Sequence, residues 1–315
     1  MRKILTVSLN PALDSAADVD VVKPDLKLRC VNTSLEPGGG GVNVSRAIKL
    51  LEGESRAFVA LGGATGNMMA ELLAQEEIDV MRFDGPEMTR QSFAILETST
   101  GLQYRFGQPG PMWQPKDADA ALEKITACLE PDMLVVVSGS LPPGIEADFY
   151  VRAGQHIKRA GAFMIADTSG AAKNALVAKG QGLIHVLRMD HNESEVLAGR
   201  PLPTRAEAVD FAQSLSRQGL GDLVIMARGA DGSVFATAES RFHCVAPKVD
   251  VISKVGAGDS FVGGLTLGLA RGLGFEEAGK LATAAASVAV MLPGSQLCPK
   301  PLVDRQLAGT VLTPL

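Results

Sequence analysis

The chain has 315 residues, of which 46% are hydrophobic, so it can bury a large core without a disulfide or a structural metal. The formal net charge is -5, and no stretch concentrates lysine and arginine into the basic stripe that a nucleic-acid partner requires. The four cysteines form no CxxC pair, which predicts unpaired thiols, and the four histidines are too scattered for a zinc site. We therefore expect a small molecule as partner.

Neither the first segment nor the most apolar expected helix indicates export or membrane insertion. The first segment, MRKILTVSLNPALD, has two basic residues, but its apolar run is short and Pro11 and Asp14 interrupt it, unlike a signal peptide. The most apolar expected helix, residues 281–292, is shorter than the roughly 20 residues that span a bilayer. We expect a soluble, cytoplasmic protein with no membrane partner.

Six short apolar runs predict buried parallel strands. In chain order they are ILTVSL from residue 4, AFVAL from 57, MLVVVSG from 133, AFMIAD from 162, LIHVL from 183 and LVIMAR from 223. Between them, residues 42–51, 116–129, 148–159 and 205–217 carry apolar residues at three-to-four spacing, as surface helices do. This alternation predicts a doubly wound α/β sheet, with residues 1–315 forming one catalytic domain.

Two segments interrupt the alternation. Residues from about 15–36 and 89–106 mix polar and apolar residues at short range, and the second contains a turn at Ser99–Gly101. We expect antiparallel strands there, outside the main sheet, that form a lid, a dimer surface or both.

The strongest chemical signal is a glycine-rich turn that leads into a long helix, SKVGAGDSFVGGLTLGLARGL, from Ser253 to Leu273. The backbone N–H groups of Gly256, Ala257 and Gly258 can face an anion at the positive end of the helix dipole. Asp259 follows them, and phosphoryl transfer to an alcohol needs a base for the hydroxyl proton. Asp259 is the candidate base; the alternative is that it only caps the helix.

A second glycine cluster, PGGGGVNVSRAIKLL from Pro37 to Leu51, also runs from a loop into a helix. Four consecutive glycines let a bulky polar ligand approach the backbone, and Asn43 offers both a donor and an acceptor to sugar hydroxyls. The alternative is a flexible turn without a ligand.

With both clusters the chain resembles the ribokinase-type carbohydrate kinases of the PfkB family, whose signatures are GG-x-G-x-N and D-T-x-G-A-G-D. The likeness extends over roughly residues 3 to 300. The segments LNPALDSA, KLRC, TRQ, GLQYRF and SGSLPPG most resemble the phosphofructokinase branch of the family, of the minor-isozyme type. The resemblance implies a three-layer α/β/α fold with a mainly parallel central sheet and a small antiparallel β lid, which is often also the dimer interface. We therefore expect a homodimer formed through the lid.

The resemblance also implies roles for residues on the acceptor side. Asp14 and Asn43, with Gly39 and Gly40, would bind the sugar hydroxyls, and Ser138 would line the pocket. Lys27, Arg29, Arg90 and Arg105 would bind the sugar phosphate, because guanidinium groups bind phosphate oxygens in a forked geometry.

The donor side departs from the family pattern. The family reads K-P-N-x-x-E where this chain has Arg188 to Glu193, with Asp190 in place of Asn. Ala227, before Arg228 and Gly229, replaces a serine, and Ser253 and Lys254 replace the Asp and Thr of the second signature. We expect compensation: Arg188 keeps a positive charge, Lys254 adds one, and Asp190 with Glu193 holds Mg²⁺ through water. The ATP site would comprise Arg188, Asp190, Ala227, Gly229, Lys254, Gly256 and Gly258.

The resemblance implies in-line transfer of the terminal phosphoryl group of Mg-ATP to the 1-hydroxyl of fructose 6-phosphate, with Asp259 as base. Two related activities stay open, a 1-phosphofructokinase and a tagatose 6-phosphate kinase. An alternative of another class is a non-catalytic sugar-phosphate-binding regulator with an altered nucleotide site, which the donor-side departures favour.

Overall fold

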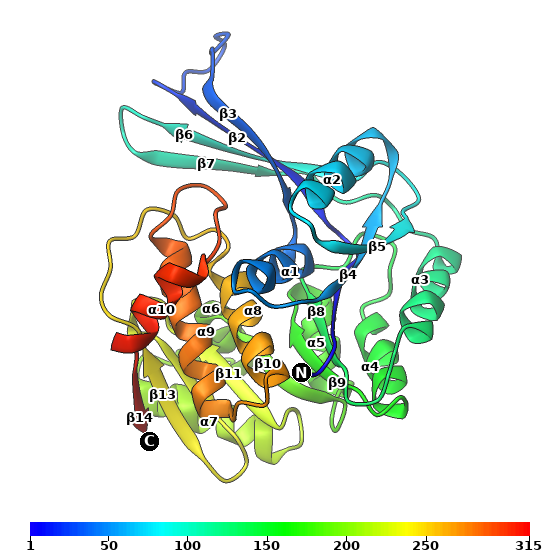
Figure 1. The fold of residues 1–315 in the computed structure, drawn as a ribbon, viewed down its shortest axis with the longest axis vertical. Coiled ribbons are helices and arrows are strands. Elements are labelled where there is room, and N and C mark those ends of the chain that lie inside the picture. The colour runs from blue at the N-terminus through cyan, green and yellow to red at the C-terminus, as the bar shows by residue number, and fades with distance from the viewer.

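The computed structural model describes residues 1–315 and contains two sheets (Figure 1). The main sheet consists of β1 (Ile4–Ser8), β4 (Arg56–Leu61), β5 (Asp79–Asp84), β8 (Leu134–Ser138), β9 (Phe163–Asp167), β10 (Ile184–Met189), β11 (Leu223–Ala227), β12 (Ser233–Ala236), β13 (Arg241–Val245) and β14 (Val311–Pro314). The smaller sheet consists of β2 (Ala12–Val19), β3 (Val31–Gly38), β6 (Arg90–Glu97) and β7 (Leu102–Gly107).

Helices cover both faces of the main sheet, which confirms the predicted three-layer architecture (Figure 1). One face carries α3 (Pro115–Ala127), α4 (Phe149–Arg159), α5 (Gly170–Lys179), α6 (His191–Ala198) and α7 (Arg205–Arg217). The other carries α1 (Gly40–Leu50), α2 (Gly63–Gln75), α8 (Ala257–Ala270), α9 (Phe275–Val290) and α10 (Lys300–Gly309). All six predicted strands and all four predicted helices are present, but α1 is buried over most of its length and is not the surface helix that was expected. α9 is a core helix.

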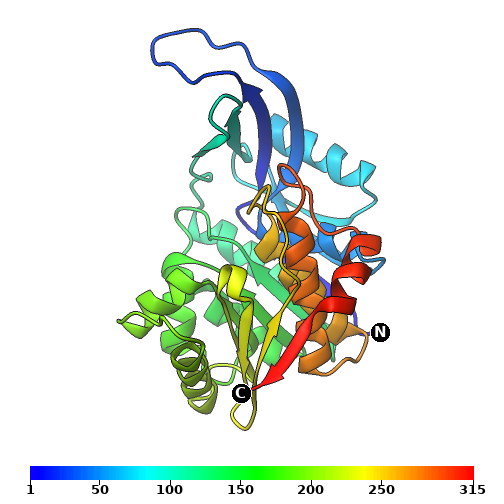
Figure 2. The same cartoon turned by 90° about the vertical axis from the view of Figure 1, so that its left-hand side faces the viewer.

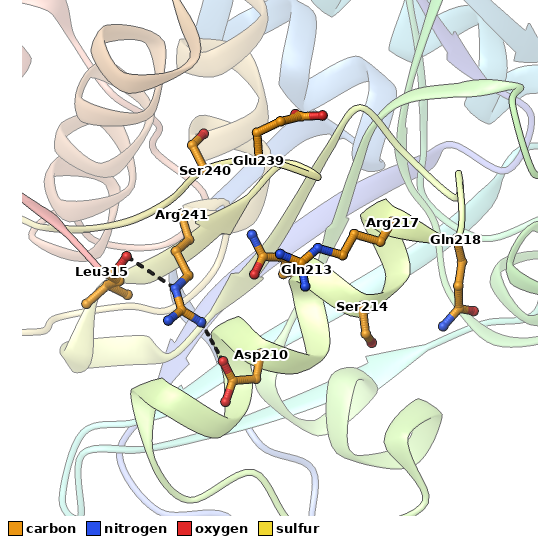
Figure 3. Close-up of a pocket in the computed structure, with 9 residues that line it drawn as sticks. All are labelled: Asp210, Gln213, Ser214, Arg217, Gln218, Glu239, Ser240, Arg241 and Leu315. Carbon is orange, nitrogen blue, oxygen red and sulfur yellow. Dashed lines mark hydrogen bonds and ion pairs between the residues drawn. The ribbon is translucent and has the colours of Figure 1, made fainter.

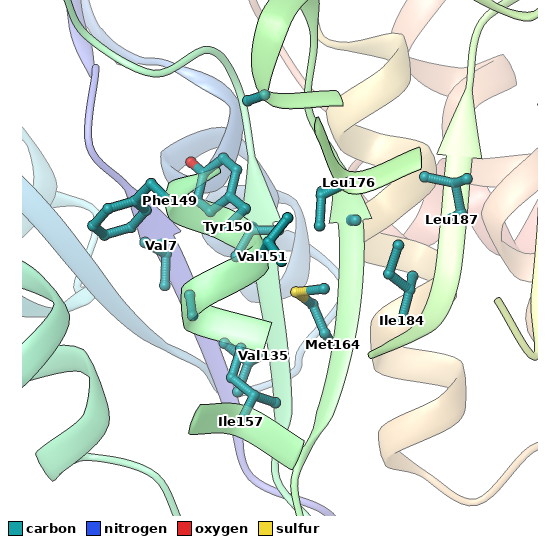
Figure 4. Close-up of a cluster of buried hydrophobic side chains, with 14 of the residues drawn as sticks. Val7, Val135, Phe149, Tyr150, Val151, Ile157, Met164, Leu176, Ile184 and Leu187 are labelled. Carbon is teal, nitrogen blue, oxygen red and sulfur yellow. The ribbon is translucent and has the colours of Figure 1, made fainter. Parts of the chain in front are cut away.

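The strands of the main sheet are apolar on both faces because alternate residues enter different cores. Val7 of β1 lies in the cluster with Phe149 and Tyr150 of α4 (Figure 4), whereas Ile4 belongs to the cluster beneath α8. This two-sided burial is typical of a parallel sheet between helical layers. The apolar runs of the sequence therefore predict the strands correctly.

The topology places the carboxyl ends of β1 and β8 at the natural position for a ligand. The main sheet has the order β14-β13-β12-β11-β10-β9-β8-β1-β4-β5 and is parallel from β11 to β5. The chain leaves β1 for β4 and β5 on one side and later fills β8 to β11 on the other. Ligands of open α/β sheets bind at the carboxyl ends of strands where the order reverses in this way.

The smaller sheet, the lid, projects from the body of the molecule (Figures 1 and 2). Its order is β3-β2-β6-β7, with antiparallel hairpins at both edges and a parallel central pair, β2 with β6. The expected antiparallel lid is therefore confirmed in its two hairpins, and only the pairing between the hairpins, β2 with β6, is parallel. The turn at Ser99–Gly101 is present between β6 and β7, and Gly101 has φ 72°.

Two smaller findings complete the fold. All four cysteines are free thiols, as their spacing predicts. None of the helices combines the length and the apolar composition needed to cross a membrane.

Candidate functional site

The segment predicted to form an anion hole, Gly256–Gly258, lies at the start of α8, where the first backbone amides have no partner within the helix. Gly256, with φ 75°, precedes α8, and the first helical amide with a partner is that of Ser260, which donates to the Gly256 carbonyl at 2.8 Å. The amides of Ala257, Gly258 and Asp259 therefore have no intrahelical acceptor. They lie at the positive end of α8, where an anion is stabilised.

Asp259 lies in the first turn of α8, and its side chain reaches toward α1. Its Oδ2 accepts a hydrogen bond from Asn43 Nδ2 at 2.9 Å, and its carboxylate accepts none from the amides of α8. The structure therefore does not support a role as a simple helix cap. Burial raises the pKa of Asp259 to about 6, although the Asn43 hydrogen bond and Arg188 lower it. A carboxylate with that pKa is ionised at neutral pH and can still accept a proton.

The four-glycine run is explained by close packing of the protein against itself. A Cβ on Gly39 would lie 2.9 Å from Pro11 Cα, and Gly39 has φ 102°. A Cβ on Gly40 would collide with the Ser138 hydroxyl and would lie 2.6 Å from the Gly139 nitrogen. The run thus brings the start of α1 against the carboxyl ends of β1 and β8, where the acceptor site was expected.

Asp14, Arg90 and Arg105 gather on the face of the lid that carries Asp14. Burial raises the pKa of Asp14 to about 6, and Arg90 and Arg105, which the strand register places on the same face of the lid, lower it. Arg90 Nε also donates to the Asn10 carbonyl at 3.3 Å, which holds β6 beside the loop after β1. These two arginines fit the predicted phosphate subsite.

Lys27 and Arg29 lie elsewhere. Both are exposed on the loop between β2 and β3, which projects beyond the rest of the molecule (Figure 2). No ion pair involves either residue. Within one chain they are therefore not brought to Asp14 and the arginines of the lid.

Two polar side chains near the carboxyl ends of β1 and β8 have buried atoms without a protein partner. Ser138, at the end of β8, is 3% exposed, and its hydroxyl has no hydrogen-bond partner. Asn10, just after β1, donates from Nδ2 to Ser140 Oγ at 3.0 Å, but its buried Oδ1 has no partner. Buried polar atoms of this kind are normally satisfied, so both suit a polar ligand. Asn10 was not predicted, although its place after a buried strand is a usable signal.

On the donor side, Arg188 projects from β10 toward the anion hole. Its Nη1 pairs with Asp167 Oδ1 at 3.0 Å, and it would lie 3.2 Å from a Cβ on Gly258. Burial raises the pKa of Asp167 despite this pairing. Sequence reasoning missed Asp167, yet it ends β9 at the ligand edge of the sheet. A guanidinium beside the positive end of a helix creates a net attraction for phosphate.

The expected metal ligands, Asp190 and Glu193, form a capping box at the start of α6. Asp190 Oδ1 accepts from the Glu193 amide at 2.8 Å, and Glu193 Oε2 accepts from the Asp190 amide at 3.0 Å. Glu193 Oε1 also pairs at 3.0 Å with Lys173, which is only 5% exposed. No group of three or more His, Cys, Asp or Glu side chains could hold a metal ion directly. Because the oxygens of these carboxylates already have protein partners, they suit a hydrated ion held through water.

The remaining donor-side residues lie in the segment before α8 and at the end of β11. Lys254 is exposed and forms no ion pair, whereas Ser253 Oγ donates to the Gly294 carbonyl at 2.9 Å and accepts from the Val255 amide at 3.2 Å. Ala227 ends β11, and Gly229 follows with φ 61°. Arg228 between them bonds the Leu202 and Pro203 carbonyls at 2.9 and 2.8 Å, so its side chain fixes the loop before α7.

A polar hollow at the C-terminus lies at a different edge of the sheet (Figure 3). Arg241 bridges Asp210 and the terminal Leu315 there. In the sheet, Arg241 pairs with Ala236 and Ala236 with Val224, near the amino end of β11. The hollow therefore lies at the amino end of β11, whereas the start of α8 lies beside the carboxyl ends of the parallel strands.

Comparisons with known proteins agree with this geometry. The model of the pfkB family of carbohydrate kinases matches residues 7–301. The ATP-dependent 6-phosphofructokinase isozyme 2 of Escherichia coli K12 is 36% identical over 298 residues, covering 95% of this chain and 96% of that protein. The protein of the same name from Mycobacterium tuberculosis H37Rv is 33% identical over 303 residues, covering 96% of this chain and 88% of that one.

A solved structure has the same fold. Phosphofructokinase-2 from Escherichia coli, in complex with fructose-6-phosphate, matches with a TM-score of 0.91 and 33% identity, covering 98% of this chain and 99% of that one. The lid, the free amides of α8 and Asp259 thus belong to a chain that matches the family over nearly its full length. The chain belongs to the pfkB family of carbohydrate kinases.

Proposed function

We propose that this protein is an ATP-dependent 6-phosphofructokinase, which converts fructose 6-phosphate to fructose 1,6-bisphosphate. The observation that carries the proposal is the position of Asp259, which lies beside three free amides of α8 and contacts Asn43 of α1. Arg90 and Arg105 near Asp14 add the positive charge that the phosphate of a phosphorylated sugar needs. The names of the relatives support the same substrate.

In the proposed mechanism Asp259 accepts the proton of the 1-hydroxyl as that oxygen attacks the terminal phosphorus of ATP. The bond between this phosphorus and the bridging oxygen breaks, and ADP leaves with that oxygen. The amides of Ala257, Gly258 and Asp259 hold the transferring group, and Arg188 lies next to the donor phosphates. Asp14 orients the sugar beneath the lid. Closure of the lid excludes water, so that the sugar hydroxyl is the acceptor.

Magnesium belongs to this proposal through water. When bound, Mg²⁺ neutralises charge on the donor phosphates. Asp190 and Glu193 would hold its hydration shell, because their own oxygens already accept protein hydrogen bonds. Lys254, exposed at the rim, would add positive charge for the nucleotide.

We also propose a cytoplasmic homodimer formed through the lid. One lid face carries a row of Leu35, Ser15, Phe93 and Phe106, because these residues pair in register across all four strands. Leu35 is 46% exposed and Phe106 is 58% exposed. The opposite face of the lid is the one that carries Asp14. A second lid would cover this row. Lys27 and Arg29 on the projecting loop would then reach the sugar phosphate of the other subunit.

A coupled turnover assay tests the proposal, with Mg-ATP and fructose 6-phosphate, fructose 1-phosphate and tagatose 6-phosphate in parallel. We expect fructose 6-phosphate to give the highest kcat/KM by at least about tenfold, an energy difference of about 1.4 kcal/mol. A higher kcat/KM for either other sugar would replace the proposed substrate. No turnover with any sugar, in a protein that binds fructose 6-phosphate by calorimetry, would favour the non-catalytic regulator.

A further inference from the structure

Arg46, in the second turn of α1, is a buried cation at the junction of three elements. It is 9% exposed, and its Nε and Nη2 donate to Glu76 Oε2 and Oε1 at 2.7 and 2.8 Å. Glu76 caps the end of α2. Nη2 also lies 3.5 Å from Glu36 on β3 of the lid. Two carboxylates therefore compensate this guanidinium, and the forked pair with Glu76 fixes its plane.

The remaining nitrogen of Arg46 points at the residue that contacts the candidate base. Nη1 donates to the Pro37 carbonyl at 3.0 Å and to Asn43 Oδ1 at 3.3 Å. Asn43 is 5% exposed, and its Nδ2 donates to Asp259 Oδ2 at 2.9 Å. A continuous chain of polar contacts thus runs from Glu76 through Arg46 and Asn43 to Asp259.

The chain of contacts determines which way the Asn43 amide faces. A carboxamide has an acceptor on one side and donors on the other, whereas a guanidinium only donates and a carboxylate only accepts. With the amide reversed, its N–H groups would face the donors of Arg46 and its oxygen would face the carboxylate of Asp259. Both contacts would become repulsive, so Arg46 selects the orientation in which Asn43 donates to Asp259.

We propose that Arg46 is a positioning residue for phosphoryl transfer: it holds the Asn43 amide as a donor to Asp259 and ties the lid strand β3 to the catalytic helices. The tie comes from the Pro37 carbonyl, which lies where β3 leads into the glycine run and α1. Arg46 touches no reacting atom, and its effect passes through Asn43. This inference rests on the proposed role of Asp259 as base.

The test is a double-mutant cycle on kcat, with Arg46→Met, Asn43→Ala and the double variant, after turnover of the wild type has been measured. We expect Arg46→Met to lower kcat by about tenfold to a hundredfold, since a small misplacement of a reacting group costs that much, and to leave KM for ATP within about twofold. In the Asn43→Ala background Arg46→Met should lower kcat by less than about threefold, because the shared path is already broken. Millimolar guanidinium should partly restore Arg46→Met and not the double variant.

Arg56→Met is the matched control, since Arg56 pairs with Asp79 at 2.8 Å on the exposed start of β4, and its kcat should equal that of the wild type. If Arg46→Met does not fold, Arg46→Lys replaces it in the cycle, since it keeps the charge but not the fork. Losses of kcat that multiply in the double variant would overturn the proposal. An inactive wild type would instead overturn the proposed function.

Discussion

At the scale of single residues, Asp14 and Asp259 share a feature that sets the chemistry of the site. Burial raises the pKa of each to about 6, and each is opposed by a different partner: arginines of the lid for Asp14 and the amide of Asn43 for Asp259. Raised pKa values of carboxyl groups are typical of groups that exchange protons or bind polar ligands. Only Asp259 lies beside the free amides of α8, and for this reason we propose Asp259 as the base and Asp14 as the sugar ligand.

The raised pKa of Asp259 predicts the acid limb of the activity profile. The base works only when ionised, so kcat should fall about tenfold per pH unit below about 6. Asp259→Asn should lower kcat by several orders of magnitude at every pH while the circular dichroism spectrum stays unchanged. A fully active Asn variant would remove Asp259 from the mechanism.

The same group predicts a pH-dependent cost in stability. Because the folded pKa lies above the unfolded value, the folded state binds the proton more tightly, and stability is lost as pH rises from about 4 through about 6. Asp259→Asn should therefore raise the free energy of unfolding above pH 6 by roughly 1 to 3 kcal/mol and change it little near pH 4. Urea unfolding of both proteins at pH 4 and pH 7.5 measures this, and an equal difference at the two pH values would contradict it.

At the scale of elements, the apolar patterns of the sequence predict single strands and helices. They do not predict which strands pair when the two strands lie far apart in the sequence. The apolar runs identify β1, β4, β8, β9, β10 and β11 because each is buried on both faces. The strands β12 to β14 and β5 were not predicted; β5 and β14 lie at the ends of the sheet order, and β12 has only four residues. The parallel pairing of β2 with β6 joins segments separated by two helices, which no local pattern encodes.

The candidate site follows the same division. The free amides at the start of α8 were predicted because a turn and the helix that follows it form within one segment. Arg46 and Lys173 were not, since a cation in a helix is typical of an exposed face, and each is buried here by carboxylates from another helix, Glu76 and Glu193. Lys254, predicted to flank the donor, is exposed and unpaired, so its role stays a prediction.

The ion pair between Lys173 of α5 and Glu193 of α6 predicts a weakened affinity of the donor site for a metal ion. Lys173 occupies Glu193 Oε1 at 3.0 Å, so the ammonium competes with a hydrated cation for this carboxylate. Lys173→Met should tighten Mn²⁺ binding in the presence of ATP by about threefold to tenfold, or roughly 1 kcal/mol, as measured by electron paramagnetic resonance. It should also lower the melting temperature of the metal-free protein, because a largely buried charge loses its partner.

Lys179→Met is the control for this substitution, since Lys179 is exposed on the same helix and forms no ion pair. It should change neither quantity. Unchanged or weaker Mn²⁺ binding in Lys173→Met would show that Lys173 does not oppose the metal, and Glu193 would then have no part in holding it.

At the scale of the whole molecule, the lid has two faces with different compositions. One face carries Asp14 and Arg105 toward the acceptor site, and the other carries the row of Leu35, Phe93 and Phe106. A four-stranded sheet with an exposed apolar face is unstable unless another surface covers it. No helix of the same chain covers this row, because Leu35 and Phe106 remain half exposed. We propose that a second copy of the lid supplies the missing cover.

The lid dimer is tested by Leu35→Glu combined with Phe106→Glu, which places charge on the apolar row without touching the face that carries Asp14. Analytical ultracentrifugation should show a dimeric wild type and a monomeric variant, and KM for fructose 6-phosphate should rise at least about tenfold, since one fully lost charge-assisted contact costs about 1.5 to 3 kcal/mol. Val311→Glu, a 55% exposed apolar residue on β14, should remain dimeric with an unchanged KM. A monomeric variant with the KM of the wild type would mean that Lys27 and Arg29 do not act on the partner's sugar phosphate, and a monomeric wild type would mean that the apolar row has another cover.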